Sequence, residues 1–198
     1  MNAVKNINKY SLIKELNTIQ NTNRESIKKL SNAILKDQSQ FESLIEIAFD
    51  YDNEISLKAL ITAELVVEQR LDWMAYNLSY FTKNIALLKD ENAIKSASKI
   101  CNLIAQDYTS KFDSAIKLII THEQLSEIIE TCFDWLLRDY KASTKTQAME
   151  ALYYIGKKIS WIHYEIKLIL DKNIENESSN YKVKANKILE LISKSSVA

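Results

Sequence analysis

The sequence predicts an all-α protein, and both its glycine and proline content and its hydrophobic periodicity support this class. The 198 residues include no proline and one glycine, Gly156. Hairpin turns rely on glycine or asparagine at positive φ, so a β-sheet protein of this length would be hard to close with one glycine. Apolar residues recur at intervals of three and four along almost the whole chain, which is helical spacing. A chain this long buries roughly 70% of its unfolded surface, so we expect one domain with a sizeable core.

The chain divides into successive expected helices joined by polar turns. The turns are rich in Asp, Asn and Ser, whose short side chains can accept the free N–H groups at a helix start. Residues 1–22 are expected to hold an N-terminal capping helix, 107–121 an irregular insertion, and 194–198 a tail. The expected helices cover residues 11–20, 23–35, 39–49, 52–69, 71–88, 92–106, 122–140, 144–159, 161–173 and 179–194.

Four of these helices share a small residue that is followed three, four and seven positions later by residues mostly suited to burial. The small residues are Ala59, Ser96, Ala148 and Ala185. The first two and the last two are each 37 residues apart, and the middle interval is 52 because it includes the irregular insertion. A period near 37 with two helices per unit predicts a solenoid, in which the small residue lets neighbouring helices approach closely.

The series resembles HEAT repeats over roughly residues 24–193. The resemblance is clearest in residues 147–152 and in Val183-Lys184-Ala185 followed by Ile188-Leu189, where a polar turn precedes the helix. It implies an α–α superhelix of about four to five antiparallel helix pairs, forming a single domain over residues 1–198, as in small bacterial HEAT-like proteins. The proline usual in the first helix of such a repeat is missing, so we expect these helices to be straighter.

Charge and cysteine content restrict the partners and the compartment. Lys plus Arg and Asp plus Glu both number 26, and the pI is about 6.8. Nucleic-acid-binding domains usually have a pI above ~9, so a nucleic-acid partner is disfavoured. No signal peptide and no apolar run near the ~18 residues of a membrane span are found, which predicts a cytoplasmic protein without a membrane partner. Cys101 and Cys132 lie in apolar stretches and are expected to be buried thiols, the alternative being a disulfide or redox pair.

The sequence contains no catalytic or metal-binding pattern. Phosphate-binding loops need several neighbouring glycines, and zinc sites need Cys and His at close spacing. The two histidines, His122 and His163, are far apart in the sequence, and no Ser–His–acid set is suggested by spacing. We therefore expect no catalytic, cofactor-binding or metal-binding residues and no enzymatic activity.

The second helices of a HEAT-like stack line its concave surface, and aromatic and charged residues fall off their apolar stripes. With the neighbouring acids, these residues would form an acidic groove suited to a protein segment bearing Lys or Arg, through ion pairs and cation–π contacts. The alternative is that the tryptophans pack between repeats and the acids are solvated. The candidate partner-binding residues are Trp73, Tyr80, Glu127, Trp135, Arg138 and Trp161.

The favoured function is a non-enzymatic scaffold whose concave face binds a protein or peptide. The alternative is a nucleic-acid-acting protein resembling helical-repeat DNA glycosylases, for which Trp135, Arg138, Asp139 and Trp161 offer the residue types; the neutral charge disfavours it. A monomer is expected, with self-association through an exposed terminal repeat as the alternative. The reason is an apolar N-terminal set that could cover the first repeat, made of Ile7, Tyr10, Leu12, Ile13 and Leu16.

Overall fold

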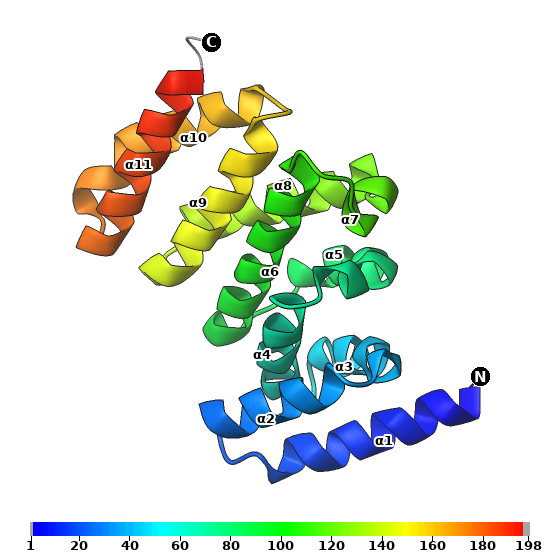
Figure 1. The fold of residues 1–198 in the computed structure, drawn as a ribbon. Coiled ribbons are helices and arrows are strands. Elements are labelled where there is room, and N and C mark those ends of the chain that lie inside the picture. Colours follow the sequence, from blue (N-terminus) through cyan, green and yellow to red (C-terminus); the bar gives the residue numbers. More distant parts are fainter. Residues whose placement is uncertain (1, 196–198) are drawn as a thin grey trace. The chain divides into compact units, whose positions relative to one another are not determined.

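Helices make up all the regular structure that the computed structural model describes, which is residues 2–195 for the backbone and 9–194 for the side chains (Figure 1). The predicted all-α class is confirmed. The chain divides into two compact units, Met1–Ala97 and Ser98–Ala198, and the long helix α6 (Glu91–Thr109) contributes to both. The prediction of a single domain stays a prediction.

In the first unit, α4 packs against both α2 and α3, and α1 lies against α3 (Figure 1). These contacts bury an apolar layer that includes Ala59 and Ala63 of α4 and Leu12 and Leu16 of α1. Tyr10, expected to help cover the first repeat, is instead exposed, and the side chain of Ile7 lies outside the described residues. The elements are α1 (Asn2–Thr18), α2 (Arg24–Ile34), η1 (Gln38–Gln40), α3 (Phe41–Ala48), α4 (Ser56–Val67), η2 (Leu71–Asn77) and α5 (Leu78–Ile85).

In the second unit, α9 is the central helix and packs against α8, α10 and α11 (Figure 1). The Glu150 carboxylate of α9 accepts hydrogen bonds from Asn102 Nδ2 of α6, at 3.1 Å, and from Lys184 Nζ of α11. One side chain therefore links α9 to two helices. Besides the end of α6, the elements are α7 (Ala115–Ile119), α8 (His122–Leu137), α9 (Ala142–Gly156), α10 (Trp161–Asn173), η3 (Ile174–Asn176) and α11 (Ser179–Ser195).

Most expected helices agree with the structure to within a few residues, but the single helix expected over 71–88 is wrong. The chain forms the 3₁₀ segment η2 and then α5. The side-chain amide of Asn77 donates to the Trp73 carbonyl at 3.1 Å, the acceptor that the Asn77 backbone N–H would use in an α-helix. Residues 107–121 contain the end of α6, a bend and α7, while 196–198 of the expected tail lie outside the described residues.

The four small residues aligned by the sequence repeat are all buried: Ala59, Ala148 and Ala185 have no exposed surface, and Ser96 is 3% exposed. Within the units, α2 lies against α4 and α9 against α11. These are pairs of expected first helices of neighbouring repeats. The predicted burial of the small residues is therefore confirmed.

Gly156 is required by a close approach between helices and not by its backbone conformation. A Cβ atom at this position would lie 2.1 Å from Cδ2 of His163 on α10. The His163 ring stacks on Tyr153 of α9, with ring centroids 5.4 Å apart, and its Nε2 lies 2.8 Å from the Tyr153 carbonyl oxygen, to which it donates. The imidazole thus occupies the space that any other residue at position 156 would fill.

We predict that the effect of G156A on stability changes sign with the residue at position 163. In the wild type, the added methyl group must displace the imidazole, so the free energy of unfolding should fall by about 1–3 kcal/mol. In an H163A background the clash is gone and the higher helix propensity of alanine should give a gain of up to about 1 kcal/mol. Urea unfolding of the wild type, both single variants and the double variant measures this. Equal effects of G156A in both backgrounds would contradict the packing argument.

A largely buried ion pair ties the start of α11 to α9. Lys145 Nζ of α9 lies 2.5 Å from Glu177 Oε1 in the turn before α11, with side-chain exposures of 9% and 19%. The ammonium group also lies 5.8 Å from the ring centre of the buried Tyr181. Burial, together with the Glu177 charge, raises the pKa of Tyr181 to about 12. The phenol is therefore neutral at physiological pH, and Glu177 is the counter-charge of Lys145.

We expect E177Q to lower the free energy of unfolding by about 3 kcal/mol, because it leaves the Lys145 ammonium buried without a compensating charge. E175Q is the matched control, since Glu175 is exposed and lies two residues earlier, in η3. A surface change of this kind should cost less than about 0.5 kcal/mol. Thermal or urea unfolding compares the two variants. Similar losses in the free energy of unfolding would show that the Lys145–Glu177 ion pair does not account for the effect of E177Q.

Candidate functional site

The six predicted partner-binding residues differ sharply in exposure. Trp73 and Trp135 are each only 3% exposed, whereas Trp161 is 52% exposed and Tyr80 is also at the surface. Trp73 and Tyr80 belong to the first unit, and the other four residues belong to the second. Burial of the two tryptophans favours the packing alternative at those positions. Trp161 is the tryptophan available to a partner.

Trp73 is held in the core of the first unit. Its ring meets Phe41 edge-on, with centroids 5.8 Å apart, and the Arg70 guanidinium lies 4.7 Å above its face. Arg70 is fixed by two hydrogen bonds to Asp72, at 2.7 and 3.0 Å, which also lower the pKa of that carboxyl group. Trp73 is thus covered on several sides by its own unit.

Tyr80 belongs to a cluster of aromatic residues in the first unit. Its ring lies edge-on to Phe49 at 6.1 Å, and Phe49 also contacts Tyr51 and Phe81. Tyr51 donates its hydroxyl to the Asn84 carbonyl at 2.8 Å, and burial together with the neighbouring Tyr80 raises the pKa of Tyr51 to about 12. Tyr80 therefore combines a packing role with an exposed edge.

Trp161 lies in an exposed apolar surface formed by two helices of the second unit. Its indole stacks on Phe133 of α8, with centroids 6.0 Å apart and planes inclined by 19°. Tyr164 and Leu168 follow Trp161 on the same face of α10, and Leu137 lies one turn after Phe133 on α8; all three are exposed. We call this surface the Trp161 patch; it consists of Phe133, Leu137, Trp161, Tyr164 and Leu168.

Sequence reasoning found Trp161 but missed the rest of the patch. An exposed apolar residue has the same sequence signal as a buried one, so periodicity alone could not separate them. One signal was present: α10 carries apolar residues on two faces, since Ile162, Ile166 and Leu170 are buried while Trp161 and Leu168 are exposed. A helix that is apolar all round is typically buried, so a second apolar face on α10 is a reason to examine that face as a contact surface.

The charges beside the patch are of both signs, since Lys167 and Lys172 are exposed on α10. Arg138 pairs with Asp134 at 2.8 Å, so the two charges compensate each other, and the carboxylates of Glu130 and Glu165 remain exposed nearby on α8 and α10. Glu127 is partly buried, and its Oε2 atom is enclosed without a hydrogen-bond partner. Of the predicted residues, Trp161 and Arg138 are therefore the ones at this surface.

The two cysteines are both buried as free thiols, as expected, and they lie against each other between α6 and α8. Burial and the Cys132 thiol raise the pKa of Cys101 well above its ordinary value, which leaves it protonated and unreactive at neutral pH. Among residues 9–194, no group of three or more His, Cys, Asp or Glu side chains is placed to hold a metal ion. In the described chain, no helix is both long and apolar enough to cross a membrane.

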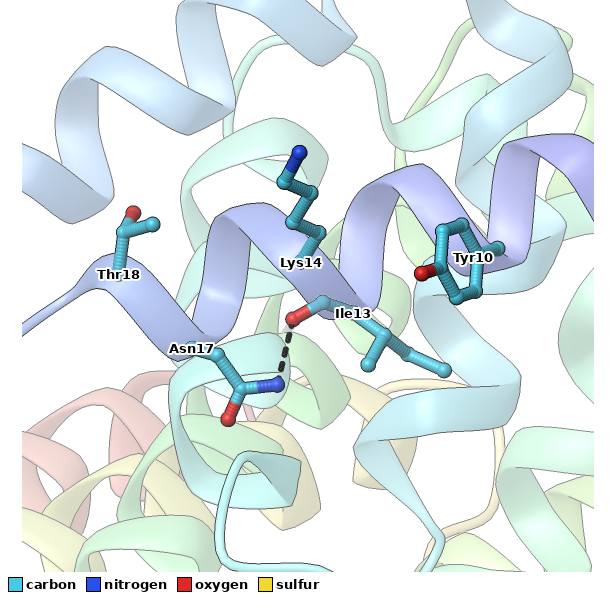
Figure 2. Close-up of a pocket in the computed structure, with 5 residues that line it drawn as sticks. All are labelled: Tyr10, Ile13, Lys14, Asn17 and Thr18. Carbon is cyan, nitrogen blue, oxygen red and sulfur yellow. Dashed lines mark hydrogen bonds between the residues drawn. The ribbon is translucent and has the colours of Figure 1, made fainter.

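A hollow of about 430 Å³ lies along the outer side of α1, beside Tyr10 and Ile13. Figure 2 shows that all the residues lining it come from this one helix, with Asn17 Nδ2 donating to the Ile13 carbonyl at 2.8 Å. Since a single helix supplies every wall, this is an open helix flank. Tyr10 there offers an exposed aromatic control for Trp161.

Comparison of the chain with protein-family models, curated proteins and solved structures finds no significant match. The resemblance to HEAT repeats therefore stays a prediction, and the case for a function depends on the geometry above.

We predict that Trp161 dominates the quenching of tryptophan fluorescence by acrylamide in the folded protein. The protein has three tryptophans, and the other two are buried. W161F should therefore remove most of the quenchable emission, whereas W135F should leave it nearly unchanged. Stern–Volmer plots measure the quenchable fraction of the emission of each variant, in buffer for the folded protein and in denaturant for the unfolded one. Strong quenching that persists in W161F would mean that Trp73 or Trp135 is open to solvent.

Proposed function

We propose that the protein is a non-enzymatic helical-repeat scaffold that binds a segment of another protein through the Trp161 patch. One observation carries the proposal: apolar side chains from two adjacent helices lie exposed around a half-exposed tryptophan. Contiguous exposed apolar surface marks interaction sites, because water contact there is unfavourable. Tryptophan and tyrosine are also the residues that most often dominate binding energy at protein interfaces.

The proposed partner segment carries apolar side chains together with Lys or Arg. The apolar side chains would cover Trp161 and Leu168, and the basic groups would lie near the exposed carboxylates of Glu130 and Glu165. Asp134 pairs with Arg138, so Glu130 and Glu165 are the carboxylates that such basic groups would meet. The open face of the Trp161 indole can also accept a cation–π contact.

The repeat architecture is part of the proposal and is supported by the helix packing within each unit. The small residues with 37-residue spacing are buried, and the paired helices α2 and α4, and α9 and α11, lie against each other. In a HEAT-like arrangement α8 and α10 are second helices, so the Trp161 patch would lie on the concave face. The curvature of a solenoid creates an extended concave face, and proteins of this type use that face for binding.

Site-specific photocrosslinking can test the binding surface in cells that contain the protein. A photoreactive phenylalanine at position 161 or 164 should crosslink one and the same protein. The same group at position 10, another exposed aromatic position, should not. Crosslinking with equal yield at all three positions, or at none, would remove the Trp161 patch as the site.

With the crosslinked protein purified, we expect W161A to weaken binding about 30-fold or more, the loss typical of an aromatic hot spot. Y10A should change the affinity less than twofold. A double charge reversal, E130K with E165K, should weaken binding of a basic segment and reduce its dependence on salt. Isothermal titration at two salt concentrations measures all three. An unchanged affinity for W161A would contradict the proposal.

A further inference from the structure

The bend between α6 and α7 is held in one shape by its own polar groups. Lys117 Nζ donates to the carbonyl oxygens of Ser110 and Phe112, at 2.6 and 2.7 Å. The Ser114 hydroxyl donates to the Asp107 carboxylate and accepts from the Lys117 backbone N–H at 3.1 Å, which caps α7. These bonds fix the backbone on both sides of residues 111–113, which we call the tip.

The tip presents a large apolar side chain to solvent between two opposite charges. Phe112 is 81% exposed, and Lys111 before it and Asp113 after it are exposed as well. Because the backbone is already ordered, covering the phenyl ring would cost little conformational entropy. An ordered, protruding aromatic side chain is suited to enter a pocket on another molecule.

A pocket of about 470 Å³ lies in the first unit, where the turn after α3 meets the turn after α5. We call it the Leu87 pocket. Its size lies within the range of small-molecule pockets in proteins. Its apolar lining includes Leu57, Leu87 and Leu88, of which Leu87 is 57% exposed, and its charged lining consists of Asp52, Lys89 and Asp90.

The rim of the Leu87 pocket carries charges of both signs. Asp90 caps the start of α6, since its Oδ1 accepts from the backbone N–H groups of Asn92 and Ala93 at 2.9 Å each, and it adds a second negative charge to that of Asp52. Asp52 and Lys89 are exposed. The tip offers an apolar group with a cation and an anion beside it, and the pocket offers an apolar hollow whose rim holds the anions Asp52 and Asp90 and the cation Lys89.

We propose that the tip of one copy of this chain docks into the Leu87 pocket of a second copy. Phe112 fills the apolar hollow, Lys111 pairs with Asp52, and Asp113 pairs with Lys89.

Such a contact joins two different surfaces, so each added copy keeps one free tip and one free pocket. Contacts of this type generate open chains when rotation does not close a ring. The average mass should therefore rise steadily with concentration and should not stop at a dimer. The contact is small, so association is expected between ~50 μM and ~1 mM, the affinity range of a few buried groups.

Sedimentation velocity on the full chain tests this with two complementary variants. F112D disables the tip and keeps the pocket, whereas L87D disables the pocket and keeps the tip; both positions are exposed, so folding should be retained, which circular dichroism checks. Each variant alone should be monomeric. An equal mixture should form dimers and nothing larger, because only one productive contact remains. V183D, at an exposed apolar position on α11, should associate like the wild type.

Several results would overturn the proposal. These are a wild type that stays monomeric up to ~1 mM, an F112D or L87D variant that associates normally, or a mixture that stays monomeric. W161A should associate like the wild type, since the tip shares no residue with the Trp161 patch. A loss of association in W161A would instead assign self-association to that patch.

Discussion

The second unit depends on how closely α9 approaches the helices around it. Ala148 and Ala151 are fully buried along α9, and at Gly156 even a Cβ would overlap the His163 ring. Because dispersion attraction falls steeply with distance, small side chains at a helix contact let the neighbouring groups pack without gaps. Close packing of α8 and α10 on α9 is what brings Phe133 against Trp161 and so forms the exposed patch.

Polar side chains then determine which turns of neighbouring helices meet. Glu150 binds Asn102 on one side and Lys184 on the other, and Lys145 binds Glu177. Net stabilisation by such partly buried ion pairs is small, since desolvation offsets most of the attraction. A shift of one helical turn, however, would separate these partners and leave partly buried charges unpaired. Apolar packing therefore supplies most of the stability, and the ion pairs make one register preferable to its neighbours.

The sequence predicted the features that follow from helix geometry and missed those that depend on neighbours. The buried small residues, such as Ala59 and Ala148, were predictable because one face of a helix repeats every three or four residues. A single narrow apolar stripe on α8 predicts that Trp135 lies outside the core. That helix instead buries a wider arc, which runs from Leu125 and Ile128 to Trp135, because it has neighbours on more than one side. The exposure of Phe112 depends on a bend that no periodicity describes.

The two proposed surfaces share no residue, so a substitution such as F112D removes one and leaves the residues of the other unchanged. An open chain of copies joined through their tips would carry one Trp161 patch on every member. A partner with several basic, apolar segments would then bind several patches at once, and its apparent affinity would rise without any new contact. Partner binding would in turn draw copies together by mass action. Partner binding and self-association should therefore both rise more steeply with protein concentration in the wild type than in F112D. That variant keeps the Trp161 patch and lacks the tip.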